Sequence, residues 1–349
     1  MSRDLAPDGS LVTCTVGIMA YNEEANIANA IATVLEQDAG CGTVGELIVV
    51  ASGCTDGTVG VVAELARQDS RIVLIVQEDR AGKASAINLF MKAARSPVLL
   101  MVGADTLVVP GTVGHLLGHF QDPGVGMVGG HPVPVNDDET FLGHSVHLVW
   151  RLHDRIARRT PKLGEIVAFR NVVGSIPNDT AVDEISIEAA ITELGYHLVY
   201  EPRAVVYNKG PTTVKDFLRQ RRRIAAGHHW VAKQSGYVAS TMSVWRIAML
   251  GLRSLIWTAG AIGLEGTARG LGFYDFLRRR PHHIWDAVTT TKSGIASPVI
   301  PIRPKGPPPP DSGDPVVSGS SDDVVIDLTA VSRLQQPESE VQEVQSSWA

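Results

Sequence analysis

The sequence predicts an α/β fold in which a mostly parallel sheet is covered by helices on both faces. Through the first half of the chain, short apolar runs rich in Val, Ile and Leu alternate with segments of helical periodicity. The apolar runs are nearly continuous, as is typical of strands buried on both faces. Hydrophobic residues make up 44% of the 349 residues and charged residues only 19%, which indicates a sizeable core.

Four strands and three helices are expected in this first half. The strands cover residues 12–20, 46–51, 71–77 and 98–102, and the helices cover about 24–37, 58–68 and 83–94. Ligands of such sheets bind beyond the carboxyl ends of the strands. Residues 21–23, the loop 52–56 and Asp105 should therefore lie along one edge of the sheet.

The second half of the chain mixes helices, strands and loops. We expect a loop at 131–138, helices over 141–159, 183–194 and 213–232, and extended segments at 197–200 and 204–207. Residues 244–272 are apolar but contain four charged residues. A spanning helix needs about 20 mostly apolar residues, so helices lying in the membrane interface fit better. Helices packed on the domain, as in a soluble protein, are the alternative.

Four regions follow from this reading. Residues 1–11 form an N-terminal extension, 12–235 the α/β domain, 236–296 apolar or amphipathic helices at a membrane interface, and 297–349 a disordered tail rich in Pro, Ser and Asp. The basic run 278–280 and Trp285 favour a lipid surface, because cations attract anionic head groups and Trp is enriched at interfaces.

Bulk charge and cysteine usage limit the possible partners and compartment. The net charge is −6, so nucleic-acid binding is not expected. The three cysteines show no metal-ligand spacing and form no even disulfide framework. The polar first ten residues lack the apolar core of a signal peptide. We therefore expect a cytoplasmic protein, peripheral on the inner face of the membrane.

Asp105 is the candidate metal ligand. It directly follows an apolar strand, and a carboxylate at that edge can bind Mg²⁺ or Mn²⁺, which prefer hard oxygen ligands. A turn or cap residue is the alternative. Lys83, which follows Gly82 at a predicted helix start, is a candidate phosphate ligand, because helix N-termini and ammonium groups both attract phosphate.

Asp183 and Glu184 are adjacent carboxylates at another predicted helix start. They could simply complement the helix dipole, or one could act as the general base that removes a proton from an attacking hydroxyl.

Three arginines follow Gln220 in the last predicted helix of the domain. Helical periodicity places Arg221 in the apolar stripe and Arg223 nearly opposite. An inward Arg needs an anionic partner. A diphosphate would serve, and a carboxylate of the protein is the alternative.

The order of these motifs resembles family 2 glycosyltransferases. The segments that carry the resemblance are Tyr21-Asn22-Glu23-Glu24, the loop 52–58, the Gly-Lys helix start at 82–88, Gly103-Ala104-Asp105-Thr106, Asp183-Glu184 and the Gln-Arg-Arg-Arg run at 220–223. Each is loose alone, but six in this order are specific. The last element is more similar to membrane-associated polysaccharide synthases than to soluble transferases.

The resemblance implies a GT-A fold, a nucleotide-diphosphate sugar as donor and a role for each matched residue. Tyr21 and Glu23 would border the nucleotide, and Asp56 would help to shape the pocket for base and ribose. Lys83 would lie near the donor phosphates, and Asp105 would bind the metal.

The later motifs are assigned in the same way. Glu184 matches the catalytic base, with Asp183 just before it. Gln220 and Arg223 match the terminal element, whereas periodicity favours Arg221. Phe169 and Arg170 lie where an acceptor-side loop is expected.

Three positions depart from the family pattern. Ala51-Ser52 replaces the usual Asp-Asp, Gly103 replaces the first aspartate of the D-x-D element, and Ile224 replaces the Trp expected after the terminal Arg. We expect an inverting, metal-dependent transferase that uses a glycan or lipid acceptor. The alternative is a catalytically impaired protein that still binds a nucleotide sugar.

Overall fold

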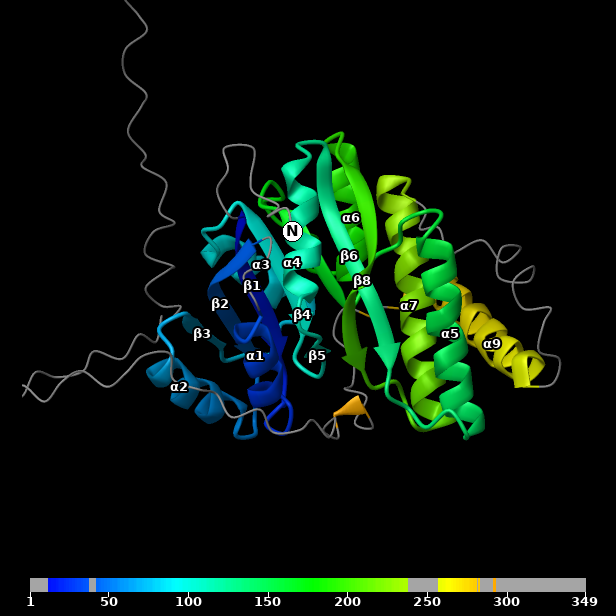
Figure 1. Cartoon of the computed structure of the whole chain (residues 1–349). Helices are drawn as coiled ribbons and strands as arrows, with labels where there is room; N and C mark the ends of the chain where they lie inside the picture. The colour runs from blue at the N-terminus through cyan, green and yellow to red at the C-terminus, as the bar shows by residue number, and fades with distance from the viewer. Residues whose placement is uncertain (1–11, 38–41, 238–256, 281, 283–290, 293–349) are drawn as a thin grey trace, which may run out of the picture.

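The computed structural model describes residues 12–37, 42–237, 257–280, 282 and 291–292. One mixed sheet runs through its centre, with the strand order β3-β2-β1-β4-β7-β6-β8-β5 (Figure 1). The N-terminal extension and the predicted disordered tail lie outside the described residues, as do residues 238–256 in the predicted interfacial region.

The first half of the sheet is parallel, as predicted. Its strands, joined by three helices, are β1 (Val12–Ala20), β2 (Gly42–Ser52), β3 (Ile72–Gln77) and β4 (Val98–Gly103). The helices are α1 (Ile27–Leu35), α2 (Thr58–Gln68) and α3 (Lys83–Ala93). The nearly continuous apolar strands of the sequence are therefore the buried parallel strands of the structure.

The second half of the sheet is mixed. Its strands are β5 (Leu107–Val108), β6 (Val125–Pro134), β7 (Ile166–Arg170) and β8 (His197–Asn208). Strand β7 runs antiparallel to both β4 and β6, β8 runs parallel to β6, and β5 pairs antiparallel with β8.

Two expectations for this half are corrected. Residues 131–134, expected in a loop, end strand β6. They pair with β8 while the β7 pairing stops at Gly129, so this stretch has a free side that tolerates Pro132 and Pro134. The extended segments 197–200 and 204–207 belong to one strand, β8.

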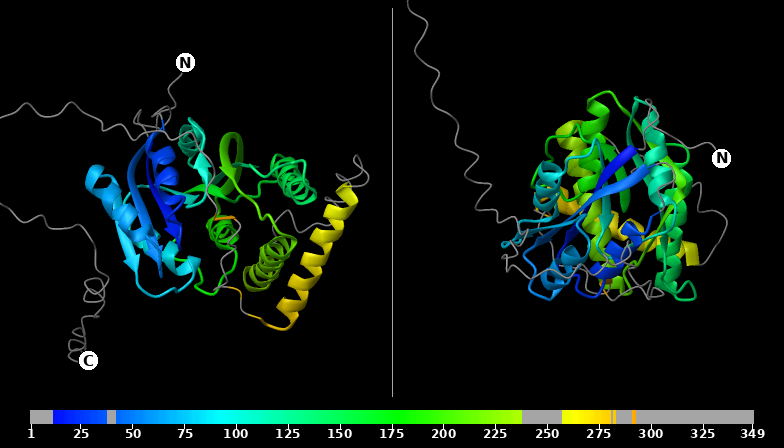
Figure 2. Two further views of the ribbon diagram at one scale, coloured as in Figure 1. Left: turned by 90° about the horizontal axis from the view of Figure 1, so that it is seen from below. Right: turned by 60° about the vertical axis from the view of Figure 1, so that its left-hand side comes forward.

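Helices cover both faces of the sheet, as predicted. Helices α1, α2 and α4 (Thr112–Leu117), the last continued by the 3₁₀ turn η1 (Gly118–Gln121), enclose one apolar core. Helices α3 and α6 (Asp183–Glu193) enclose the other. Figure 2 shows the two layers from below and from the side.

A third group of helices packs together beyond the mixed half of the sheet. It contains α5 (Phe141–Ala157), α7 (Val214–Ser235) and α9 (Trp257–Leu277), and α9 contacts both of the others (Figures 1 and 2). Two arginines of α7 pair with acids of α9, Arg221 with Glu265 and Arg222 with Asp275. Helix α9 therefore packs on the rest of the domain, and its place at a membrane interface stays a prediction. Within the described ranges, no helix has the length and apolarity needed to cross a bilayer.

Candidate active site

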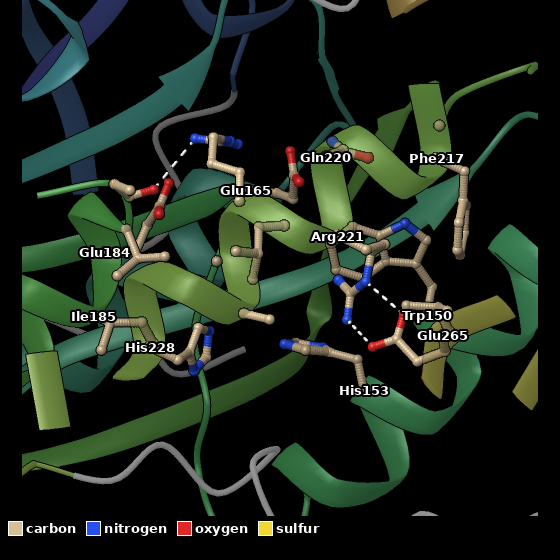
Figure 3. A pocket seen from close by; sticks show the side chains of 18 of the residues that line it. Trp150, His153, Glu165, Glu184, Ile185, Phe217, Gln220, Arg221, His228 and Glu265 are labelled. Atoms are coloured by element: carbon tan, nitrogen blue, oxygen red, sulfur yellow. Dashed lines mark hydrogen bonds and ion pairs between the residues drawn. The ribbon is translucent and has the colours of Figure 1, made fainter. Parts of the chain in front are cut away.

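The candidate site lies at the carboxyl ends of the parallel strands and is centred on Lys83. Gly82 has φ of +91°, a conformation that favours glycine, and the turn starts α3 with Lys83 at its first position. The ammonium nitrogen of Lys83 lies 3.1 Å from Asp183 Oδ2 and 3.0 Å from Glu184 Oε1. Figure 3 shows Glu184 beside the cavity. Two of the predicted motifs, about a hundred residues apart, therefore meet.

The two carboxylates of this pair differ in acidity. Burial alone would raise the pKa of Glu184, but the ion pair with Lys83 outweighs it and lowers the pKa to about 2. Burial raises the pKa of Asp183, and the neighbouring Glu184 adds to the effect against the attraction of Lys83. Glu184 is thus the carboxylate held in its ionised form, as a general base requires.

Asp105 and Glu165 bring two more carboxylates to the same place. Burial raises the pKa of Asp105 to about 6, with a smaller contribution from the charge of Glu23. Burial likewise raises the pKa of Glu165 to about 7, and Asp105 and Glu184 add to it. Glu165 also has φ of +62°, and such backbone outliers cluster at functional sites. Glu165 belongs to no sequence motif and was not predicted.

Two adjoining cavities meet at this cluster. One, of about 250 Å³, is bordered by Tyr21, Glu23 and Ser52, from segments to which the family resemblance gives the nucleotide. The other, of about 510 Å³, extends between α5, α6, α7 and α9 (Figure 3). The residues that line both are Lys83, Asp105, Glu165, Glu184, Gln220 and Thr291. This junction is where groups bound in the two cavities would meet.

The smaller cavity includes two residues that sequence analysis missed, Arg80 and Lys292. The Arg80 guanidinium lies 3.9 Å from the centroid of the Tyr21 ring, close enough for a cation–π contact. The Lys292 ammonium nitrogen lies 2.5 Å from Glu23 Oε1 and donates to the backbone oxygen of Asn22 at 3.1 Å. No local pattern could have identified Lys292, because about 270 residues separate it from its partners.

Asp56 connects the loop after β2 to the loop after β1. Its carboxylate accepts hydrogen bonds from the backbone N–H of Thr58 at 3.0 Å and of Glu24 at 3.2 Å. Asp56 lines neither cavity. Its oxygens thus bind the first residue of α2 and fix the loop after β1. Its part in a pocket for base and ribose stays a prediction.

The structure also separates Arg221 from Arg223. Arg221 is partly buried, on the inward side that periodicity predicted, but it forms a two-pronged ion pair with Glu265, with N–O distances of 2.7 and 2.8 Å. This is the alternative in which a carboxylate of the protein is the partner. Arg223 lines the larger cavity, donates to the Ala181 carbonyl at 3.2 Å and feels the charges of Asp183 and Glu184.

Phe169 and Arg170 are wrongly placed as acceptor contacts. Strand β7 runs antiparallel to β4, so Ile166 pairs with Val102 near the site while Arg170 pairs with Val98 at the far end. Phe169 is fully buried in the core, and Arg170 donates to the carbonyls of Phe120, Asp122 and Val125. The residues that β7 presents to the site are those before it, including Glu165.

The acidic cluster fits a divalent ion only in combination with a ligand. Among the described residues, no group of three His, Cys, Asp or Glu side chains could hold a metal ion. Mg²⁺, however, commonly binds through one or two carboxylates, with phosphate oxygens and water completing the shell. Asp105, at the junction of the cavities, meets that requirement.

Comparisons with known proteins agree with this geometry. Residues 15–180 match the family model for glycosyl transferase family 2, and residues 98–267 match that for glycosyl transferase family group 2. A mannosyltransferase from Pyrobaculum calidifontis, solved with GDP-Man and Mn²⁺, has a similar fold, with a TM-score of 0.53 and 24% identity over 77% of each chain.

Curated relatives point the same way. Over 262 residues the chain is 25% identical to the poly-beta-1,6-N-acetyl-D-glucosamine synthase of Staphylococcus aureus (strain COL), covering 69% of this chain and 61% of the relative. The Staphylococcus epidermidis enzyme of that name is 23% identical over 227 residues, covering 61% of this chain and 54% of the relative. The chain thus spans less than two thirds of these relatives.

The sheet topology and the similar solved structure identify the fold as the GT-A type of α/β fold. The two family models and the curated relatives support a family 2 glycosyltransferase.

Proposed function

We propose that this protein is an inverting glycosyltransferase that moves a sugar from a nucleotide-diphosphate donor to an acceptor hydroxyl. The observation that carries the proposal is the junction of the two cavities, where Lys83, Asp105 and Glu184 meet. A donor in the smaller cavity and an acceptor in the larger one would bring the reacting atoms together there. The names of the relatives, a synthase of an N-acetylglucosamine polymer and a mannosyltransferase, support this class of reaction.

The donor would be held by groups on both sides of the junction. Tyr21 and Glu23 border the nucleotide, and Lys83 binds the diphosphate as a point charge. Gln220 and Arg223 reach the same region from α7. We do not assign Arg221 to the donor, because Glu265 already occupies its guanidinium.

Glu184 would act as the general base. The acceptor oxygen attacks the anomeric carbon while the bond from that carbon to the phosphate oxygen breaks, and the acceptor proton passes to the Glu184 carboxylate. The nucleoside diphosphate leaves and the anomeric configuration inverts. Without donor, Lys83 pairs with Glu184 and keeps it a weak base. A diphosphate that competes for Lys83 would raise the pKa of Glu184 and make it a better proton acceptor.

Asp105 would hold the Mg²⁺ or Mn²⁺ together with the donor phosphates. Such an ion neutralises the charge that develops on a diphosphate leaving group. Because Gly103 supplies no second carboxylate, Asp105 alone should hold the ion weakly until the donor arrives.

The test is donor consumption. Purified protein is incubated with radiolabelled UDP- and GDP-sugars, Mn²⁺ and a panel of glycan and lipid acceptors. We expect Glu184→Gln to lower kcat by about 10²–10⁴-fold, the range for a lost general base, while the donor still binds. Asp105→Asn should remove the response to Mn²⁺, and Glu193→Gln, at the far end of α6, serves as the matched control. Turnover that survives both site substitutions would refute the mechanism.

A binding protein without catalysis is the second candidate. Gly103 and Ser52 stand where the family pattern has carboxylates, and Lys83 already engages both acids of the site. Calorimetry separates the two functions, because a binding protein would take up nucleotide sugar with no turnover of any acceptor.

We further propose a peripheral location on the cytoplasmic face of a membrane. Several large apolar residues of α9 are exposed, namely Ile262, Leu271, Phe273, Tyr274 and Leu277, and three arginines follow at 278–280. Co-sedimentation with vesicles tests this: binding should require anionic lipid and weaken with salt. Equal binding to neutral vesicles, or none, would count against it.

A further inference from the structure

Buried polar atoms without hydrogen-bond partners gather on the larger cavity. Among the described residues, such side-chain atoms are His228 Nδ1, Asp183 Oδ1, Asn208 Oδ1, Gln121 Nε2 and the ring nitrogens of His153, whose ring also interacts with the backbone of Lys162. All of these except Gln121 line the cavity of about 510 Å³. Native proteins pair nearly all buried polar groups, because an unsatisfied one is costly. A cluster of them on one cavity indicates a ligand that brings several hydrogen-bonding groups.

The same cavity also has an apolar wall. Trp150 from α5 and Phe217 and Ile224 from α7 line it (Figure 3). An alkyl chain would suit that wall but would leave every one of the polar atoms unsatisfied. A sugar ring suits both, since it carries apolar C–H faces and a rim of hydroxyl groups.

The two histidines can form hydrogen bonds with hydroxyl groups. His153 and His228 are only 7% and 6% exposed, and burial lowers the pKa of each well below its usual value, with the positive charge of Lys162 adding to the effect. A neutral imidazole offers one donor and one acceptor. A hydroxyl group likewise donates and accepts, so it can pair with either nitrogen.

We propose that the larger cavity binds a saccharide unit of the acceptor, and that His153, His228 and Asn208 determine specificity for it. This inference rests on the proposed function and narrows its acceptor to a molecule that already carries a sugar. Internal water is the competing explanation, because a polar cavity of this size can hold water that satisfies the same atoms.

The experiment compares acceptors that share one alkyl tail. Octyl β-glycosides of glucose, mannose and N-acetylglucosamine are tested against 1-octanol, below micelle-forming concentrations, in transfer assays and by calorimetry without donor. We expect at least one glycoside to bind and to accept sugar, and 1-octanol to do neither. Equal use of 1-octanol, or no calorimetric binding of any of the three glycosides, would overturn the proposal.

Single substitutions then test which residues bind the acceptor. His153→Phe and His228→Phe should each raise the acceptor KM roughly five- to tenfold, about the effect of one lost hydrogen bond, without an equal rise in the donor KM. The melting temperature should hold or increase, since an apolar group of similar shape removes an unsatisfied atom. Gln121→Met, which removes an unpartnered atom away from the cavity, should leave the acceptor KM unchanged.

Two results would contradict this assignment. An unchanged acceptor KM in both histidine variants would show that these rings do not read the acceptor. A fall of several degrees in melting temperature with no change in KM would show that water had satisfied them. Because glycoside binding is measured without donor, it separates failure of this inference from failure of the proposed transferase activity, in which nucleotide sugars are neither bound nor consumed.

Discussion

At the scale of single residues, Lys83 controls the acidity of the site. It is the cation that holds the pKa of Glu184 at about 2, below its ordinary 4.5, although burial acts in the opposite direction. If Lys83 were removed, burial would remain and the pKa of Glu184 would rise.

The corresponding prediction concerns Lys83→Gln. A base works only when it is ionised, so activity is lost as pH falls through the pKa of the base. The acid limb of residual kcat/KM should therefore move to higher pH in the variant, which a pH profile of the free enzyme reports. Lys92→Gln, at the exposed end of the same helix, is the control. An acid limb at the same pH in both variants would mean that Glu184 is not the base.

At the scale of elements, partly buried ion pairs hold α9 against α7. Arg221 and Glu265 keep only 21% and 13% of their side-chain surface exposed, and Asp275, which pairs with Arg222, is fully buried. The pair with Arg221 lowers the pKa of Glu265 to about 2 against the effect of burial. Its contribution to stability is thus complete above pH 4.5 and is lost as pH falls towards 2.

Replacing one partner of the pair of Arg221 and Glu265 should lower the free energy of unfolding more than replacing both. We expect Glu265→Gln to lower the free energy of unfolding by about 3 kcal/mol, because a buried guanidinium loses its counter-charge. Arg221→Met combined with Glu265→Leu should restore most of that loss. Chemical denaturation measures both, and Glu64→Gln, in an exposed pair with Arg67, should cause no measurable change. An additive double variant would disprove the coupling.

At the scale of the whole molecule, the site is assembled from segments far apart in the chain. The predicted boundary at residue 235 passes through it, since Glu265, Arg269 and Phe273 line the larger cavity and Lys292 the smaller. The division into domains remains a prediction, but residues 12–235 alone do not enclose either cavity.

A shortened chain tests this dependence. Residues 1–237 should melt at a lower temperature and bind UDP or GDP more weakly than the full chain, because Lys292 and the partners of Arg221 and Arg222 are missing. Removal of 297–349, predicted from composition to be disordered, is the control and should change neither property. Full nucleotide affinity in the shortened chain would show that Lys292 plays no part in the donor cavity.

The sequence predicted the features that depend on local patterns and not those that depend on contacts between residues far apart in the chain. The apolar runs of β1 to β4 are local signals, so the parallel half and the position of Asp105 followed from them. Strand direction is not encoded in such a run, and therefore Phe169 and Arg170 were assigned to the wrong end of β7. Periodicity showed that Arg221 faces inward, but its partner Glu265 lies 44 residues away and could not be identified. Glu165 and Lys292 carry no motif at all.

The contact of Lys292 with the loop after β1 also has a consequence for biosynthesis. The last strand of the sheet ends at Asn208, so the sheet can form well before Lys292 emerges from the ribosome. At about 5–20 residues per second, the interval is on the order of several seconds. A nascent chain would therefore have folded the loop after β1 before the lysine that contacts it, and under the proposed function it would bind donor fully only once that residue is present.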